Sequence, residues 1–238
     1  NCPTVYNPFR NNIGANHIPP NGGLGGQIDN DHDSYGDNIN PQYSCDPDRN
    51  NPTVPSPTCN STITQNSVLT GSLFCRNGEG LTLGANNIVL DCARWRLNGN
   101  GSNTGIKLAN GVTGATIKNC QIRNFGNGIK ATSYLTYSNL IINNFFANLN
   151  NAVDIGVNRW NIAKTTGQNI IGGPYLAGNF WHDYRGADKN WDGIGDNNLP
   201  YSSNGQIATG GDYLPLVYVK ALSLSLVSKQ EIPVSVMT

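Results

Sequence analysis

Short runs of alternating apolar and polar residues recur about every 23 positions through the middle of the chain. Written in register, two units begin "GIKLANGVTGATIKNC" at Gly105 and "GIKATSYLTYSNLIINN" at Gly128. "GLTLGANNIVLDC" precedes them from Gly80, and "AVDIGVNRWNIAK" follows from Ala152. Because alternation with period two places apolar side chains on one face of a strand, each unit predicts three short strands joined by Gly- and Asn-containing turns.

Apolar residues also occupy the same phase in successive units, which predicts coils stacked on one another. One coil cannot bury its inward face alone, so neighbouring coils share a continuous core. The fold predicted is all-β, a right-handed parallel β-helix of about four to five coils. The expected stacked pairs are Ile106 with Ile129 and Val153, Ile117 with Ile141, Ile122 with Phe146, and Phe125 with Leu149.

The same register predicts two polar columns. Asn119 and Asn143 fall at the same turn of successive coils, where their amides are expected to hydrogen-bond as a ladder. Lys107, Lys130 and Asp154 are expected one above another on an outward face, where the carboxylate partly offsets the repulsion between the lysines.

Four regions are expected along the chain. Residues 1–57 form an irregular N-terminal module, 58–177 the β-helix, 178–216 a closing module and 217–238 a β-strand tail. In the tail apolar residues alternate with serines or other residues in two runs: Leu222, Leu224 and Leu226, then Ile232, Val234 and Val236. Two interpretations stay open: the tail caps its own chain, or it adds a strand to a neighbouring subunit and makes a homo-oligomer or polymer.

Composition narrows the range of functions. The chain has 238 residues, only 13% of them charged, and a formal net charge of zero, which argues against nucleic acid as a partner. The 37 asparagines and 28 glycines favour tight turns over long helices. No apolar run approaches the length of a membrane span. The opening "NCPTVY" lacks a Met, which suggests a processed mature protein.

Six cysteines without a CxxC pair favour disulfides in an oxidising compartment, hence an extracellular or cell-surface protein. Free thiols in a cytosolic protein remain the alternative. Cys92 and Cys120 fall on adjacent coils, whose spacing of about 4.8 Å suits a disulfide. The other expected pairs, among fifteen possible connectivities, are Cys59 with Cys75 and Cys2 with Cys45. The sequons at Asn60 and Asn100 are candidate glycosylation sites.

The repeats, with "CNSTITQNSVLTGSLFCRNGEG" before them, resemble secreted archaeal and bacterial surface proteins of the NosD-like, carbohydrate-associated β-helix group. The segment "GNFWHDYRGADKNWDGIGDNNLPY" resembles the closing module that follows such repeats. The resemblance implies the fold but leaves function open, because the group spans binding modules, surface-layer components and accessory proteins. Copper handling, associated with one branch, finds no soft-ligand cluster: the single Met is Met237, and the three histidines are scattered.

Two nine-residue stretches, "DNDHDSYGD" and "DKNWDGIGD", predict calcium loops, because both place oxygen donors at alternate positions. They resemble the loops of thrombospondin type 3 repeats and dockerins. An Asp- and Asn-rich solvated turn is the alternative for each. The expected donors are Asp188, Asn190, Asp192, Ile194 and Asp196 in one loop, and Asp29, Asp31, Asp33, Tyr35 and Asp37 in the other; Ile194 and Tyr35 would use their carbonyls.

Catalysis finds little support. The acids within the repeats are Glu79, Asp91 and Asp154, and the last two are expected on well-separated coils, so they do not form a glycosidase pair. Four basic residues offer two interpretations: a basic strip for acidic sugars, as a polysaccharide lyase would need, or a solvated face, which is the simpler one. The four residues are Arg94, Arg96, Arg123 and Lys118.

Carbohydrate binding is the alternative function. Candidates for stacking on sugar rings are Trp95, Trp160 and Trp191, whereas Trp181 and Tyr184 are expected to pack the closing module onto the last coil. The function favoured by the sequence is a non-catalytic, calcium-stabilised, self-assembling subunit of an extracellular surface layer, sheath or filament.

Overall fold

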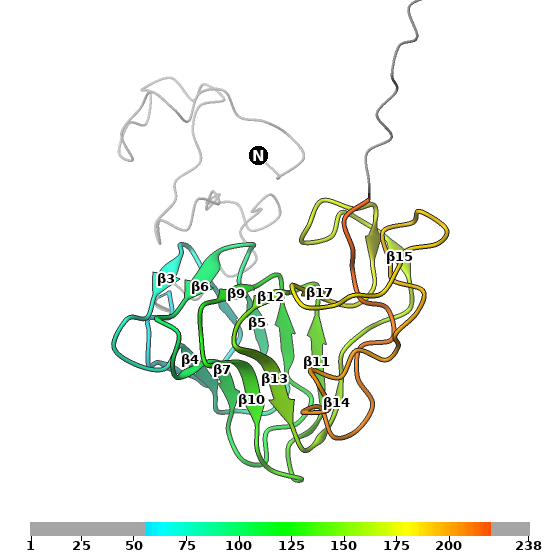
Figure 1. Ribbon diagram of the computed structural model, residues 1–238. Coiled ribbons are helices and arrows are strands. Elements are labelled where there is room, and N and C mark those ends of the chain that lie inside the picture. Colours follow the sequence, from blue (N-terminus) through cyan, green and yellow to red (C-terminus); the bar gives the residue numbers. More distant parts are fainter. Residues whose placement is uncertain (1–55, 220–238) are drawn as a thin grey trace, which may run out of the picture.

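The computed structural model describes residues 56–219, which form three parallel β-sheets wound around one core (Figure 1). The first sheet contains β1 (Thr62–Ile63), β4 (Leu81–Leu83), β7 (Thr104–Leu108), β10 (Asn127–Ala131) and β13 (Asn150–Asp154). The second contains β2 (Ser67–Val68), β5 (Val89–Asp91), β8 (Thr116–Lys118), β11 (Tyr137–Ile142) and β14 (Val157–Arg159). The third contains β3 (Leu73–Phe74), β6 (Arg96–Asn98), β9 (Gln121–Arg123), β12 (Phe145–Ala147) and β17 (Phe180–Trp181).

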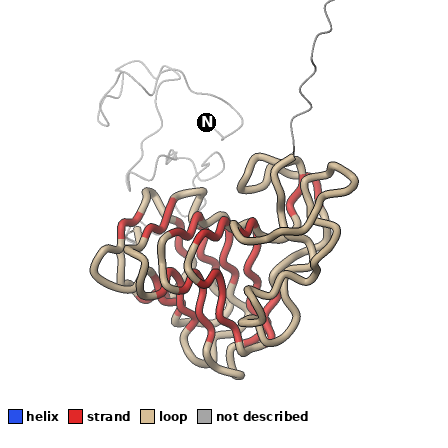
Figure 2. Tube along the Cα trace, viewed as in Figure 1, coloured by secondary structure: helices blue, strands red, loops and turns tan. Residues whose placement is uncertain are grey.

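Each coil contributes one strand to each sheet in turn, so strands adjacent in a sheet come from successive coils. Four coils are complete, and β13, β14 and β17 begin a fifth. Within the described residues the regular structure is all strand, and tan turns separate the strands (Figure 2). The predicted parallel β-helix is confirmed.

Apolar columns run through the interior from coil to coil. In the third sheet Leu97 pairs with Ile122, which pairs with Phe146, which pairs with Trp181, and all four side chains are buried. The predicted pair of Ile117 and Ile141 in the second sheet is also confirmed. Side chains repeat at one phase because only stacking with the next coil removes each inward face from water.

The predicted register is wrong where the fifth coil begins. Ile129 pairs with Ala152, and Lys130, which correctly stacks beside Lys107, pairs with Val153. Ile106, Ile129 and Ala152 follow one another at intervals of 23 residues, whereas the predicted pairing of Ile129 with Val153 requires an interval of 24. Asp154 consequently points into the core, fully buried, and does not join the lysine column.

A second register error concerns the turn after the third sheet. Phe125 is buried, but Leu149 is 80% exposed, so the two do not stack in the core. Instead the Leu149 N–H donates to the Phe125 carbonyl. The residue of the next coil at the position equivalent to Phe125 is Asn148, whose Oδ1 accepts from the Phe125 N–H.

Asparagines hold the corners of the coils in two ways. The predicted ladder is confirmed: Asn143 Nδ2 donates to Asn119 Oδ1 at 2.7 Å, and Asn119 Nδ2 donates to Asp91 Oδ1 at 2.9 Å. Both ladder asparagines adopt positive φ, 58° at Asn119 and 52° at Asn143. Asn tolerates this backbone conformation better than most residues, which accounts for part of its abundance.

Other asparagines lie inside the corners and replace ladder bonds that the backbone cannot make there. The Asn144 amide accepts from the Cys120 N–H at 2.9 Å and donates to the Ile117 carbonyl at 3.0 Å. One side chain thus satisfies a buried donor and a buried acceptor of the preceding coil. The same two-way bridge is made by Asn139, Asn148, Asn158 and Asn179.

The last coil is covered by an irregular segment that follows β17, in yellow and orange at one end of Figure 1. Within it Ile207 bridges to Asp154 of β13, and Leu216 bridges to Phe180 of β17. An antiparallel hairpin, β15 (Thr165–Thr166) and β16 (Tyr175–Leu176), stands before β17. A second, smaller apolar cluster gathers there under the hairpin: Phe145, Ile170, Ala177, Ile194 and Leu216.

Candidate functional site

The Asp188 loop is closed by its own carboxylates. Asp188 accepts from the N–H groups of Asp192 (3.2 Å) and Gly193 (2.8 Å), and Asp196 accepts from the Lys189 N–H at 2.6 Å. Asn190 Oδ1 accepts from the Asp192 N–H at 3.1 Å. Gly193 has φ 84°, the left-handed conformation expected where such a loop turns sharply. The side chains of Asp188, Asn190 and Asp196 therefore accept hydrogen bonds from backbone N–H groups of the loop itself.

A lysine from outside the loop binds one of these carboxylates. Lys164 Nζ lies 2.6 Å from Asp192 Oδ2 and 4.0 Å from the centre of the Tyr175 ring. The hydrogen bond to Asp192 raises the pKa of Lys164. Burial alone would raise the pKa of Asp192, but the hydrogen bonds from Lys164 and the Ile194 N–H bring it below its usual value.

The calcium expectation stays a prediction. Within residues 56–219 no group of three or more His, Cys, Asp or Glu side chains is arranged to hold a metal ion. The Asp29 loop, from Asp29 to Asp37, lies outside the described residues, as do Cys2, Cys45 and the alternating residues of the tail.

The closing segment is attached to the coils through a buried carboxylate. Asp212 Oδ2 accepts from the Asn179 N–H at 2.7 Å and from Trp181 Nε1 at 2.8 Å, and Oδ1 accepts from the Leu214 N–H at 3.0 Å. Burial raises the pKa of Asp212 to about 7, although these hydrogen bonds act in the opposite direction. Trp181 itself stacks on Tyr201, with ring centroids 4.3 Å apart. The expectation that Trp181 packs this segment onto the last coil is confirmed.

Asp154 is a second buried carboxylate at the same end. It accepts from the Gly156 N–H and from Asn158 Nδ2, both at 2.9 Å, and from Trp160 Nε1 at 3.3 Å. Burial raises its pKa. Its backbone joins Ile207 of the closing segment, so Asp154 is structural and unavailable to substrate.

A polar cluster that the sequence did not reveal lies beside β17. Asn151 Nδ2 donates to Asp183 Oδ1 at 2.7 Å and lies 3.1 Å from the Tyr201 hydroxyl and 3.2 Å from His182 Nδ1. The Tyr201 hydroxyl donates to Asp183 at 2.8 Å, and burial raises its pKa. "WHDY" is visible in the sequence, but nothing local to it predicts the partners from positions 151 and 201.

Two of the predicted disulfides are confirmed. Cys92 and Cys120 join adjacent coils with Cα atoms 4.7 Å apart. Cys59 and Cys75 close the first coil with Cα atoms 5.5 Å apart. These bonds indicate an oxidising compartment, which agrees with a protein exported from the cytosol.

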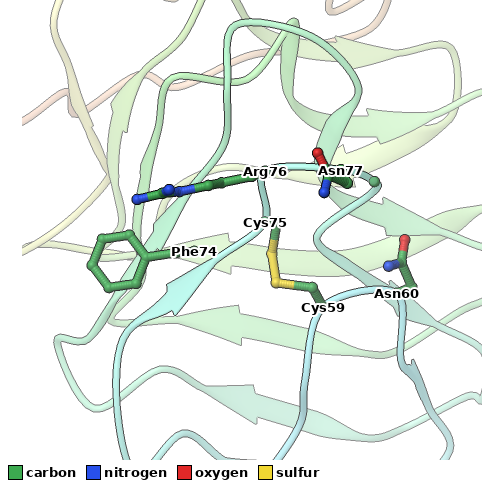
Figure 3. A pocket seen from close by; sticks show the side chains of 7 residues that line it. Cys59, Asn60, Phe74, Cys75, Arg76 and Asn77 are labelled. Atoms are coloured by element: carbon green, nitrogen blue, oxygen red, sulfur yellow. A yellow bond between two sulfur atoms is a disulfide. The ribbon is translucent and has the colours of Figure 1, made fainter.

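An open pocket of about 350 Å³ lies beside the Cys59–Cys75 bridge. Figure 3 shows Phe74 and Arg76 extending to the same side of the first coil, away from the disulfide. Asn60 lines this pocket, and its Oδ1 accepts from the Glu79 N–H at 3.0 Å. In the second sequon Asn100 Nδ2 donates to the Arg76 carbonyl. Glycosylation at either asparagine stays a prediction.

The three tryptophans proposed for sugar stacking differ in exposure. Trp160 is 1% exposed, packs against Trp181 and donates to Asp154, so its assignment to carbohydrate binding is wrong. Trp95 and Trp191 are 43% and 60% exposed, and remain available for contact. Trp160 is buried because the chain after β14 turns inward under the closing segment, which a strand pattern does not predict.

The predicted basic strip separates into three parts. Lys118 lies on the second sheet and forms an ion pair with Asp91 at 3.2 Å. Arg94 donates to two carbonyls of the hairpin loop, those of residues 168 and 169. Only Arg96 and Arg123 are neighbours on the third sheet. A four-member strip is therefore wrong, because consecutive strands of one coil belong to different sheets.

The fold defines a disulfide-bonded parallel β-helix whose last coil is covered by an irregular closing segment. A family model described as periplasmic copper-binding protein (NosD) matches residues 44–186, and the chain belongs to this NosD family. No curated protein and no solved structure matches the chain. Among the described residues no helix is long and apolar enough to span a membrane.

Proposed function

We propose that this protein is a non-catalytic structural subunit of an extracellular assembly, in which copies join through their ends. The observation that supports the proposal is the difference between the two ends of the β-helix. Strands β13 and β17 continue into bridges with the closing segment. Strands β1, β2 and β3 each stand at the edge of their sheet, with no further partner within residues 56–219.

An open edge of parallel strands is a template for strand addition. The tail offers a suitable strand, since Leu222, Leu224 and Leu226 alternate with serines and present one apolar face. In this proposal the tail of one copy pairs with the first coil of the next. Calcium at the Asp188 loop would stabilise the segment from which the tail leaves, because Val217 donates to the carbonyl of Gly193 in that loop.

Copper binding, which the family's printed name describes, is not included. Within residues 56–219 His182 is the single histidine, there is no methionine, and every cysteine is in a disulfide. These donors do not fit a copper site, which in proteins is built from imidazole, thiolate or thioether groups.

The test measures particle size by light scattering and negative-stain microscopy, at several protein concentrations, with calcium and then with chelator. The first comparison is between the full chain and a chain ending at Val219, which retains the packing of Tyr218 on Phe180. Ordered polymers that disappear with the tail support the proposal. A monodisperse monomer in every condition refutes it.

A matched pair of variants tests whether assembly requires the apolar side chains of the tail. Replacing Leu222, Leu224 and Leu226 by Ser removes the apolar face, and replacing Ser223 and Ser225 by Ala leaves it intact. We expect only the first variant to lose assembly. Equal assembly by both shows that this strand is not the connector.

A further inference from the structure

The outward face of the third sheet bears two neighbouring arginines, and its strands contain no acidic residue. Arg96 of β6 lies beside Gln121 of β9, and Arg123, two residues further along β9, lies beside Asn98. The two guanidinium groups therefore start from diagonal positions on strands about 4.8 Å apart. The two ion pairs found within residues 56–219 lie elsewhere, at Lys118 and Lys164.

Arg123 is held in place but incompletely satisfied. Its guanidinium carbon lies 3.9 Å from the centre of the Phe145 ring, and Nη2 donates to Gln121 Oε1 at 3.3 Å. Its Nε is buried and has no hydrogen-bond partner in the described part of the chain. Burial and the nearby charge of Arg96 lower its pKa, while Tyr218 acts in the opposite direction. An anion between the arginines would offset the repulsion between the two guanidinium charges.

Amides and exposed rings surround the arginines. Asn98 Oδ1 accepts from Asn124 Nδ2 at 2.9 Å, which holds two amide groups on this face. Phe74 pairs with Asn98 at one end and is 60% exposed. At the other end Tyr218 is 62% exposed, with its ring against the edge of Phe180 at 5.1 Å.

We propose that this arginine face, made of Phe74, Arg96, Asn98, Arg123 and Tyr218, binds an extended acidic polysaccharide of the uronic acid type. The polymer lies along the axis of the coils. The guanidinium groups bind sugar carboxylates in two-point contacts, amides bind hydroxyl groups, and the aromatic rings pack on the sugar faces. Carboxylate recognition alone would suit an acidic peptide equally, but the exposed rings and amides favour sugar.

The first experiment measures binding of the full chain to polygalacturonate by affinity gel electrophoresis and titration calorimetry. Fully methyl-esterified polygalacturonate serves as the uncharged comparison. We expect binding to the acid form, weakened by salt, and weak or no binding to the ester. Equal binding to both polymers, or none to the acid form, overturns the proposal.

The second experiment compares matched arginine variants. Arg96→Gln with Arg123→Gln removes both charges, and Arg159→Gln removes an exposed arginine on β14 of the second sheet. We expect the double variant to lose about tenfold or more in affinity, and Arg159→Gln to bind like the parent. Thermal unfolding confirms that the variants are folded. A folded double variant with parental affinity places the binding elsewhere and overturns the assignment.

Two further comparisons test the sugar. Phe74→Ala is expected to lose affinity several-fold, whereas Tyr134→Ala, at a 77% exposed ring outside the third sheet, is expected to have no effect. Poly-glutamate is expected to bind more weakly than polygalacturonate, and equal binding would assign the face to acidic peptides. The Leu222, Leu224 and Leu226 to Ser variant is expected to bind polygalacturonate normally, so failure of assembly and failure of this proposal are distinguishable.

Discussion

The stacked coils and the closing segment stabilise the same core by different means. Inside the coils each buried position repeats, as where Leu97, Ile122 and Phe146 follow one another in the third sheet. At the closing end the contacts are individual, and two of them use buried carboxylates, Asp154 and Asp212. A repeat distributes the loss of one side chain over similar neighbours, whereas a unique contact has no substitute.

The largest expected effect tests whether the closing contacts are irreplaceable. Trp181→Ala removes a fully buried ring that stacks on Phe146 and Tyr201, and it leaves Asp212 without one donor. We expect the free energy of unfolding to fall by about 3–5 kcal/mol. Urea unfolding followed by circular dichroism measures it, and Trp191→Ala, at an exposed ring, should change little.

Ile117→Ala in a middle coil provides the other side of this comparison. Its expected loss is about 2–4 kcal/mol, which is smaller because the coils above and below can relax into the space. A loss as large as that of Trp181→Ala would contradict the contrast between repeated and individual contacts.

The next effect concerns the staple between coils. Replacing Cys92 and Cys120 by Ala removes a disulfide that closes a sequence separation of 28 residues, and we expect a loss of about 3 kcal/mol. Removing the Cys59–Cys75 bond, with a separation of 16, should cost slightly less. The urea midpoints of the two double variants decide the order. The reverse order would show that the first coil depends on its bridge more than loop length explains.

The third prediction uses the titration of Asp212. Its folded pKa of about 7 exceeds that of an unfolded Asp, near 3.9, so the folded state binds the proton more tightly. Stability from this group is complete below about pH 4 and is lost as the pH rises through about 7. We expect a fall on the order of 2 kcal/mol. The pKa difference sets a limit of about 4 kcal/mol, and relaxation around the charge reduces it.

Unfolding curves at pH 4, 5.5 and 7 measure this slope, and Asp212→Asn should reduce it. Asp154, whose pKa is also raised, contributes in the same direction, so the double Asn variant should be flattest. Burial raises the pKa of Tyr184, to which the Asp212 charge adds a smaller effect, so Tyr184 ionises well above this range. An unchanged slope in Asp212→Asn would contradict the assignment.

The smallest expected effect sharpens the calcium proposal. Lys164→Met removes the ammonium group from Asp192 and frees that carboxylate for a cation. If the loop binds calcium, its affinity should rise about two- to fivefold, measured by titration calorimetry. Asp188→Asn should lower it. A loop that binds no calcium in either the parent or Lys164→Met would refute the site.

The sequence predicts the repeated part of the molecule better than its end. The pairs of Ile117 with Ile141 and Ile122 with Phe146 follow from period and polarity, as does the Cys92–Cys120 disulfide, whereas Cys59 with Cys75 is one choice among several. The register fails at Val153 because alignment by hydrophobicity places it in the core, where Ala152 and the charged Asp154 belong. A carboxylate is not expected at a buried position of a hydrophobic pattern. Asp154 is tolerated there because Asn158 and Trp160 donate hydrogen bonds to it, and the sequence alone does not reveal these donors.

Site prediction has the same limit. The sequence identifies the basic residues but cannot assign them to sheets, so it groups Lys118 with Arg96 and Arg123. The polar cluster around Asn151 unites residues up to 50 positions apart, and only the folded chain brings them together. Contacts at the end of a repeat protein are made by residues that do not recur with the repeat, so periodicity in the sequence does not predict them.

The two disulfides also determine how the protein responds to mechanical load. If neighbours pull on the chain from its two ends, tension passes through each sulfur bridge and bypasses the residues between the bridged cysteines, 16 and 28 positions apart in sequence. The oxidised chain therefore extends about 150 Å less than the reduced chain before it is taut. If such subunits form an extracellular filament, the maximum extension of each subunit under load would be smaller in the oxidised filament than after exposure to a reductant.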